Sequence, residues 1–205
     1  MATVSPFAPG RSPFHIKGVA YRGVSTYLDA KVPGGFQALL DSIADVQLRE
    51  FLKQPFLSAS LYDVFPLAQV KDHAAKLLGI SDFDYQRQTS QVQADADLGG
   101  IYKVILRVFN PPALMERIGR LTAQYFDFAT ETHIERLQNQ EATLTRLGFL
   151  KPLVEWYEPT TVGYFETALA RTGAKDVKVK VSATDTGQQA QGVPMVNVTA
   201  HVTWR

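Results

Sequence analysis

Hydrophobic residues recur at helical spacing through the first half of the chain. Between Phe14 and Leu28 they are separated by steps of three and four residues, which predicts a helix despite two internal glycines. The same spacing predicts shorter helices over Phe36–Ile43 and Leu48–Leu52, after a Pro-Gly-Gly break. Pro66 then begins a further helix, which Gly79 ends as its C-terminal cap. This half of the chain is therefore predicted to be helical.

The helical pattern continues to the middle of the chain. The segment Asp82–Phe109 is polar at first and strongly apolar after Leu98, and the pair Gly99-Gly100 inside it predicts a kink or a close helix contact. Asn110 is a good N-cap for the next helix, predicted over Pro111–Phe128, because its side chain can accept a hydrogen bond from the first turn. Two helical segments are thus expected directly before the strands.

The pattern changes after residue 130, where alternating hydrophobic and polar positions predict strands. Two strands around a polar Asn-Gln link indicate one hairpin, and two later strands indicate a second, with a helix between the hairpins. The predicted elements are strands over Thr132–Gln138 and Ala142–Leu147, a helix from about Pro159 to Gly173, a strand over Val177–Ala183, a polar loop over Thr184–Gln191 and a strand over Met195–Trp204.

This order of elements predicts an α+β domain, in which an N-terminal helical half is followed by a four-stranded antiparallel sheet with helices on one face. We expect a flexible tail over residues 1–13 and a single domain over residues 14–205, with the helical half at 14–129 and the sheet half at 130–205. The tail contains three prolines and no apolar run of the kind found in export signals.

Composition and charge narrow the functions to be considered. Lys and Arg total 21 and Asp and Glu total 20, so no overall field would attract nucleic acid or an anionic membrane. The densest basic stretch, Lys175, Lys178 and Lys180, alternates with valines and predicts the solvent face of a strand. The sequence has no cysteine, which excludes disulfides, and no stretch approaches the roughly 20 apolar residues that span a bilayer. We expect a soluble, cytoplasmic protein with no nucleic-acid partner and no membrane span.

No catalytic or metal-binding motif is visible in the sequence. The four histidines are scattered, and a surface position is the commoner place for a lone histidine with polar neighbours. They are His15, His73, His133 and His201. His133 and His201 could approach each other if their strands are neighbours, which leaves open an enzyme with a dispersed site that also uses Asp95 or Asp97. On a helix, however, those two aspartates point in different directions. We expect no catalytic residue and no metal site.

A set of aromatic residues lies between Tyr102 and Phe165. They could fill the core, form a dimer face or line an apolar pocket for a small planar ligand, and the sequence leaves these alternatives open. The residues that we assign to a ligand pocket or an interface are Tyr102, Tyr125, Phe149, Trp156 and Tyr157.

Three segments give the chain a resemblance to a known family. They are Ile16–Gly23 (IKGVAYRG), Ala94–Arg107 (ADADLGGIYKVILR) and Thr172–Val179 (TGAKDVKV). They resemble an uncharacterised paralogous family of myxobacteria of about this length, over nearly the whole chain, with no activity that could be carried over. The order of helices, hairpin, helix and hairpin is more distantly similar to the heme nitric-oxide/oxygen-binding (H-NOX) domain, the 4-vinyl reductase domain and the TRAPP trafficking subunits. That superfamily implies ligand sensing or protein–protein assembly.

The H-NOX resemblance implies a heme, and its motifs can be compared with this sequence. H-NOX domains ligate iron through a histidine on the helix before the sheet and hold the heme propionates with a Tyr-x-Ser-x-Arg motif. The helix predicted over Pro111–Phe128 contains no histidine, and the second strand of the first hairpin continues as Thr145–Phe149 (TRLGF). His133 lies just beyond that helix and is the remaining candidate for an axial ligand. We expect no heme and no other cofactor.

These observations predict a non-enzymatic regulatory or sensory module that binds a small apolar ligand or a protein partner. The alternative is a structural adaptor or homodimerising scaffold subunit, as among TRAPP-like relatives, and a large exposed apolar patch without an internal cavity would favour it. The third hypothesis is the enzyme with a dispersed site. A protein partner or self-association is expected for the first two.

Overall fold

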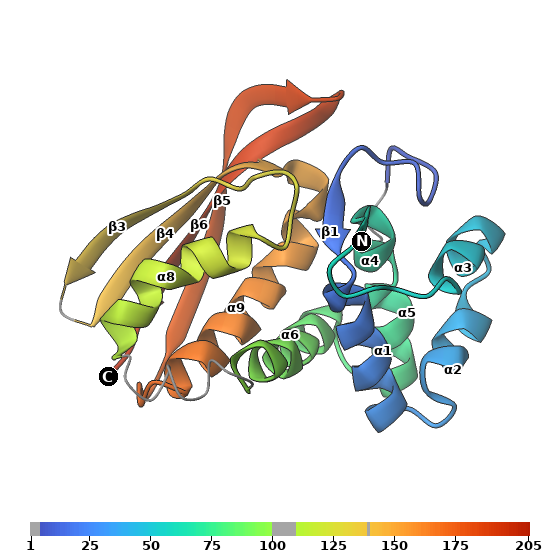
Figure 1. The fold of residues 1–205 in the computed structure, drawn as a ribbon, viewed down its shortest axis with the longest axis horizontal. Helices are drawn as coiled ribbons and strands as arrows, with labels where there is room; N and C mark the ends of the chain where they lie inside the picture. Colours follow the sequence, from blue (N-terminus) through green and yellow to red (C-terminus); the bar gives the residue numbers. More distant parts are fainter. Residues whose placement is uncertain (1–4, 100–109, 139) are drawn as a thin grey trace.

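The computed structural model describes residues 5–99, 110–138 and 140–205. A group of short helices with a two-stranded sheet forms one half, and a larger sheet with helices α8 and α9 forms the other (Figure 1). The elements of the first half are β1 (His15–Lys17), α1 (Val19–Lys31), α2 (Gly35–Ser42), α3 (Val46–Leu52), β2 (Leu61–Asp63), α4 (Phe65–Gln69), α5 (Lys71–Leu78) and α6 (Asp82–Gly99). The elements of the second half are α8 (Pro111–Ala123), β3 (Thr132–Gln138), β4 (Glu141–Leu150), the short 3-10 helix η1 (Lys151–Leu153), α9 (Val154–Ala170), β5 (Lys178–Ala190) and β6 (Val193–Thr203).

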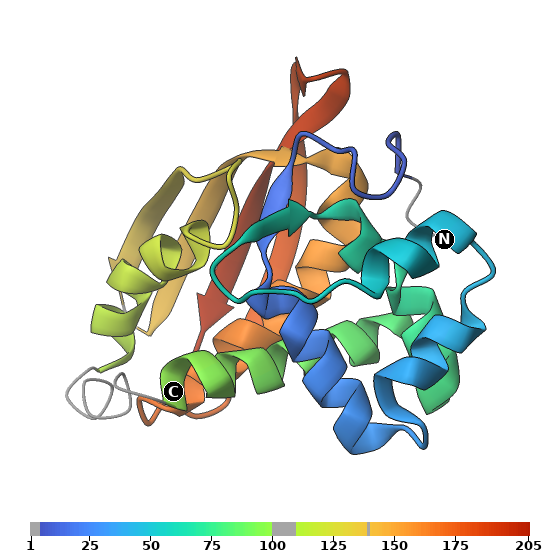
Figure 2. The ribbon, with the colours of Figure 1, turned by 45° about the vertical axis from the view of Figure 1, so that its right-hand side comes forward.

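The larger sheet has the strand order β3-β4-β6-β5, and every neighbouring pair is antiparallel. The last strand, β6, therefore lies inside the sheet. Helices α8 and α9 cover one face (Figures 1 and 2). Alternate residues of β6 are buried, among them Val198, Ala200 and Val202, and the residues between them are partly exposed. The predicted α+β class, with a four-stranded antiparallel sheet covered on one face, is confirmed.

The start of the chain differs from the prediction. The helix predicted from Phe14 is wrong at its beginning, because the chain first forms β1, and α1 begins only at Val19. The cause is tertiary packing. Ile16 is buried in the β1–β2 pair, and an added Cβ at Gly18 would lie 2.3 Å from the carbonyl oxygen of Leu57. Helical spacing alone does not reveal this pairing with a distant segment.

The helices on the larger sheet have different bounds from those predicted. Helix α8 ends at Ala123, so its predicted extension to Phe128 is wrong. Helix α9 begins at Val154, ahead of the predicted start, and Pro159 lies inside it. Because α9 buries residues on nearly all sides, against α6 and the sheet, packing offsets the backbone donor that proline lacks.

The second hairpin is longer than predicted. The polar segment Thr184–Gln191, expected to be a loop, is mostly strand, because β5 continues to Ala190. Its partner β6 extends with it, and the pairing resumes at Gln189 and Pro194 after an irregular stretch. The end of this hairpin projects beyond the rest of the sheet (Figure 1). Backbone pairing, and not the alternation of side chains, forms this part of the strand.

Two predicted helix ends are confirmed. Gly79 has a φ of 67° and ends α5 in the left-handed conformation. Asn110 begins α8, and its Oδ1 accepts a hydrogen bond of 3.0 Å from the backbone N–H of Ala113. The kink predicted at Gly99-Gly100 includes a residue outside the described ranges and stays a prediction.

Residues 7–12, which we expected in a flexible tail, make specific contacts with the first half. The ring centroids of Phe7 and Phe65 are 5.7 Å apart. The backbone N–H groups of Gly10 and Ser12 donate to Oδ2 of Asp63 at 2.9 and 3.2 Å. These contacts hold this segment against β2 and α4.

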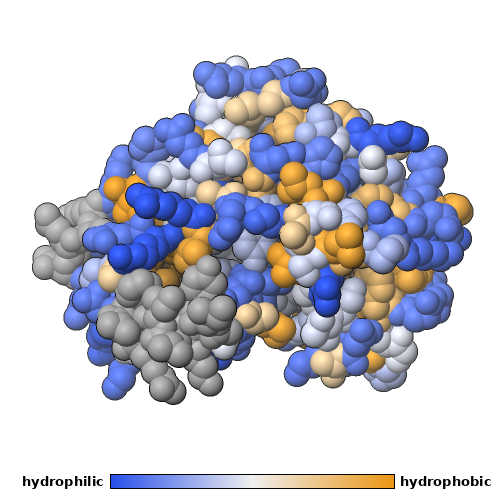
Figure 3. All heavy atoms as spheres, in the orientation of Figure 1, coloured by the Kyte–Doolittle hydropathy of each residue, from blue (hydrophilic) through white to orange (hydrophobic). Residues whose placement is uncertain are grey.

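The described surface carries few large hydrophobic side chains. On the face drawn in Figure 3, hydrophobic residues form small groups separated by hydrophilic ones. Lys178 and Lys180 are exposed on β5, with partly buried valines between them, as predicted for the solvent side of a strand. Across the described ranges, no helix is both long and apolar enough to cross a membrane. The exposed large hydrophobic residues are Val46, Leu57, Leu61, Leu77, Phe83 and Val92.

Candidate functional site

A small apolar cavity lies where the two halves meet. Its volume is about 90 Å³, and the atoms that face it are mostly apolar, although several wall residues also carry polar groups. The wall consists of Ile16 on β1, Ala20 and Val24 on α1, Leu67 on α4, Gln86, Thr89, Ser90 and Gln93 on α6, Thr122 on α8, Tyr125 and Phe126 after α8, and Trp156, Tyr157, Thr160, Thr161, Tyr164 and Phe165 on α9. A molecule in this cavity would touch both halves of the fold.

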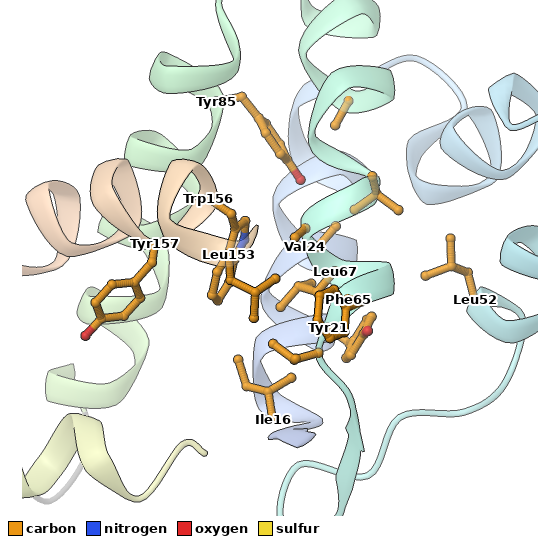
Figure 4. Close-up of a cluster of buried hydrophobic side chains, with 14 of the residues drawn as sticks. Ile16, Tyr21, Val24, Leu52, Phe65, Leu67, Tyr85, Leu153, Trp156 and Tyr157 are labelled. Atoms are coloured by element: carbon orange, nitrogen blue, oxygen red, sulfur yellow. The ribbon is translucent and has the colours of Figure 1, made fainter. Parts of the chain in front are cut away.

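Aromatic rings fill most of the space around the cavity. Trp156 is 4% exposed and points from α9 toward Val24 and Leu67, whereas Tyr157 points to the other side of the helix (Figure 4). The ring of Phe126 lies 6.5 Å from that of Trp156 and 6.1 Å from that of Tyr157, between centroids, in edge-to-face geometry. The cavity is the space that these rings leave open.

The structure brings together three of the five residues predicted for a pocket or interface. Tyr125, Trp156 and Tyr157 line the cavity. Phe149 is fully buried behind the wall, with its ring centroid 4.3 Å from that of Tyr157. Tyr102 lies outside the described residues. A role in ligand binding stays a prediction for all five.

A buried arginine supports this wall from the sheet. Arg146 on β4 is 1% exposed. Its Nε donates to the Tyr157 hydroxyl at 2.8 Å, its Nη1 to the Ala129 carbonyl at 2.8 Å and its Nη2 to the Thr122 hydroxyl at 2.7 Å. The guanidinium also lies over the Phe126 ring, 5.6 Å from its centroid. Within the described residues these partners are all neutral, so the positive charge is stabilised by dipoles and a ring.

This role of Arg146 was not predicted from the sequence. The signal that could have found it is the alternation along β4, where Ala142, Leu144 and Arg146 share the face toward the helices. A charged residue at an inward position predicts a specific set of hydrogen-bond partners.

A second polar network lies at the edge of the cavity. The hydroxyl groups of Tyr125 and Tyr164 both donate to Oδ2 of Asp97, the latter at 3.1 Å. Nε2 of Gln93 donates to Oδ1 of Asp97 at 2.7 Å and approaches the Tyr125 hydroxyl at 3.2 Å. Gly23 on α1 makes room for this glutamine, because an added Cβ there would lie 2.5 Å from Oε1 of Gln93. The network joins α6, α9 and the segment after α8.

Burial keeps these two tyrosines protonated. Desolvation raises the pKa of Tyr125 and of Tyr164 well above the usual value, and the negative charge of Asp97 raises each pKa further. Both hydroxyls therefore remain hydrogen-bond donors to the carboxylate at ordinary pH.

The histidines and aspartates of the enzyme hypothesis are not brought together. His133 and His201 pair across β4 with Thr145 and Thr143, on the sheet face opposite the inward Arg146. The imidazole of His133 bonds Glu131, and that of His201 bonds Thr143.

The two aspartates lie on α6, which packs against α9, and have other partners. Asp95 forms an ion pair of 2.6 Å with Arg171, and Asp97 bonds the tyrosines. Among the described residues, no group of three or more histidines, aspartates or glutamates could hold a metal ion.

Sequence comparison alone assigns no family. No family model matches the chain, and no curated protein sequence matches it. The resemblance to the myxobacterial family therefore stays a prediction.

Comparison of structures gives a clear answer for the fold. An H-NOX protein from K. algicida, in the Fe(II) unliganded form, aligns with a TM-score of 0.63 over 93% of this chain and 97% of that chain, at 11% identity. An H-NOX protein from S. oneidensis in the Fe(II)NO state aligns with a TM-score of 0.61 over 93% of this chain and 99% of that chain, at 15% identity. The chain has an H-NOX-like fold. An oxygen-binding H-NOX domain related to soluble guanylate cyclases also aligns, with a TM-score of 0.58 and 6% identity over 92% of each chain.

The described residues at the junction of this H-NOX-like fold do not fit a heme. The cavity of about 90 Å³ is smaller than the roughly 300–1,000 Å³ of pockets for drug-sized ligands. No histidine belongs to its described wall, and residues 100–109 contain none in the sequence. His133, the remaining candidate ligand, lies on the other face of the sheet. The expected absence of a heme stays a prediction.

Proposed function

We propose that this chain is a non-enzymatic sensory or regulatory module that binds a small apolar molecule in the cavity between its two halves. The cavity itself carries the proposal. Native interiors are close-packed and contain few voids larger than a water molecule, and an empty void forfeits dispersion contacts with its wall. A ligand that fills about 90 Å³ would restore those contacts and stabilise the folded state.

The size and polarity of the cavity define the ligand. A water molecule needs roughly 10–15 Å³ and two to four polar partners, and an engineered apolar cavity of about 150 Å³ in another protein binds benzene or xenon. Among the described buried polar atoms without a partner, Thr161 Oγ1 is the one that belongs to this wall. The cavity therefore favours a molecule no larger than benzene that makes at most one hydrogen bond inside it.

The position of the cavity gives the ligand a way to act on the fold. Ala20 and Val24 belong to the first half, and Trp156 and Thr161 belong to α9 in the second half. A ligand that contacts α1 in the first half and α9 in the second half stabilises one arrangement of the two halves relative to others. Solved structures with this fold include an oxygen-binding domain and a protein in the Fe(II)NO state, so the fold is compatible with small-molecule sensing.

Native mass spectrometry of the protein purified from its own host tests the proposal. We expect extra mass that disappears on denaturation. Xenon then probes the cavity directly, because it needs no polar partner, and we expect a saturable shift of the 129Xe resonance. Ala20→Leu should fill the cavity and abolish the saturable shift, whereas Ala96→Leu, on the exposed side of α6, should leave it unchanged. Equal xenon binding by both variants would rule out this cavity as the site.

The second candidate is a structural adaptor or homodimer. The surface available to it consists of single exposed hydrophobic side chains, among them Leu57 at 63%, Leu61 at 48% and Phe83 at 44% exposure, which is less than the large apolar patch that would favour it. The same native mass spectra distinguish the two functions. A clean dimer or a co-purifying protein, without extra small mass, would replace the sensor by the adaptor.

A further inference from the structure

Two hollows of the structure share one wall. One hollow is the apolar cavity, and the other is a groove of about 210 Å³ whose wall includes Lys17 and Asp97. Tyr125 and Tyr164 belong to the walls of both. The two tyrosines therefore lie between the apolar cavity and a groove that carries charged groups.

The shared wall is held by the carboxylate of Asp97. This group has about four lone-pair positions, and its described partners occupy three of them with neutral donors, namely the two tyrosine hydroxyls and the Gln93 amide. In the part of the chain that the structure describes, no Lys or Arg lies within ion-pair distance of it. The carboxylate also lines the groove, so its remaining capacity is open to a donor that arrives from there.

We infer that Tyr125, Tyr164 and Asp97 form the entrance to the cavity, and that the ligand is a short amphiphile whose apolar tail enters between the tyrosines while its amine head binds Asp97. This inference rests on the proposed function, because it names the ligand class of the same cavity. An ammonium group donates hydrogen bonds and carries the charge that the carboxylate lacks among its described partners. Lys17 and Asp97 both belong to the wall of the groove alone, but Asp97 is hydrogen-bonded to the two tyrosines that line both hollows, so its carboxylate is the charged group held at the shared wall.

Tyr125 is the side chain that opens the entrance. Tyr164 lies in the middle of α9 and is 8% exposed, whereas Tyr125 follows the end of α8 and is only partly buried. The Tyr125 carbonyl accepts a hydrogen bond of 2.8 Å from the backbone N–H of Lys17, which fixes its backbone. Opening therefore consists of a rotation of the Tyr125 ring away from Asp97.

Isothermal titration with n-butylamine, n-butanol and butyrate tests the head-group preference, with xenon as a separate probe of the apolar cavity. For the wild-type protein we expect butylamine to bind at least tenfold more tightly than butyrate, because one charge-assisted hydrogen bond to Asp97 contributes about that ratio of affinities. Asp97→Asn should remove that preference and keep xenon binding. Asp95→Asn, a matched change at an exposed residue paired with Arg171, should alter neither.

The outcomes separate the two proposals. Equal affinity for butylamine and butyrate, with normal xenon binding, would overturn the inferred head group and keep the cavity as a binding site. Tighter binding of butyrate would assign the head-group role to Lys17 and overturn the inference. Absence of xenon binding by the wild-type protein would contradict the proposed function itself. If Asp97→Asn fails to fold, Tyr125→Phe provides the second test. It removes one neutral donor from Asp97 and frees a further lone pair of the carboxylate, so it should strengthen the preference for butylamine, and a weaker preference would overturn the inference.

Discussion

Replacing Gly163 by alanine tests the helix contact that supports the cavity. An ideal Cβ at position 163 would lie 2.2 Å from the carbonyl oxygen of Arg87, and ordinary contacts begin at 3.4 Å. The obstacle is the backbone of α6, which cannot rotate aside as a side chain can, so α6 and α9 must separate by about 1.2 Å. Overpacking of this kind costs about 1–3 kcal/mol, and the better helix propensity of alanine offsets about 1 kcal/mol. Because both surfaces are rigid, we expect a net loss of about 2 kcal/mol.

Denaturant unfolding of three proteins measures this loss. The matched control is Gly99→Ala, since an ideal Cβ at Gly99, the last residue of α6, meets no described atom within 4 Å. We expect Gly163→Ala to unfold at a lower denaturant concentration and Gly99→Ala to unfold at the wild-type concentration or above it. The separation of α6 from α9 should also enlarge the cavity and increase its capacity for xenon. If both variants unfold like the wild type, the close contact at Arg87 does not limit the packing of these helices.

Three further predictions concern the buried polar groups and the heme. Arg146→Lys should lower the free energy of unfolding by about 2–3 kcal/mol, because one ammonium cannot reach the three acceptors of the guanidinium, and wild-type stability in denaturant would contradict this. Burial raises the pKa of Asp63 in the folded state above its unfolded pKa of about 3.8. The protonated carboxyl group therefore stabilises the fold below pH 3.8, and this stabilisation is lost as the pH rises through the folded-state pKa. Unfolding measured across this range should therefore show Asp63→Asn gaining stability relative to the wild type as pH rises, and a constant difference would show that the pKa is not raised. Titration with hemin should give no saturable Soret band, and a band that saturates at one heme per chain would show that the junction opens far enough to hold one.

The larger sheet was predictable because its signal is local. Residues such as Val198 and Val202 alternate with polar neighbours, and a period of two identifies both the strand and its buried face. The first strand was not predictable in this way. Its residues have helical spacing, and the pairing with β2 depends on a segment more than forty positions away, as at His15 and Asp63.

The candidate site was predictable only in part. The density of aromatic residues indicated Tyr125, Trp156 and Tyr157, but the same density also led to Phe149, which lies behind the cavity wall. From the sequence, Asp97 was weighed together with Asp95 as part of a dispersed enzyme site. In the structure its hydrogen-bond partners include Tyr164 on α9. Tertiary packing alone brings these groups together, so the spacing of residues in the sequence does not predict the contact.

The inner position of β6 has a consequence for the synthesis of the chain. When β5 leaves the ribosome, the place beside it is still empty, because β4 and β5 are joined only through β6. The helices of the first half can pack as they emerge, but four strands cannot become one sheet until Val193–Thr203 has been translated. A nascent chain halted at Gly192 would leave unpaired the edges of β4 and β5 that β6 covers in the finished sheet, and those edges are what a chaperone would have to protect.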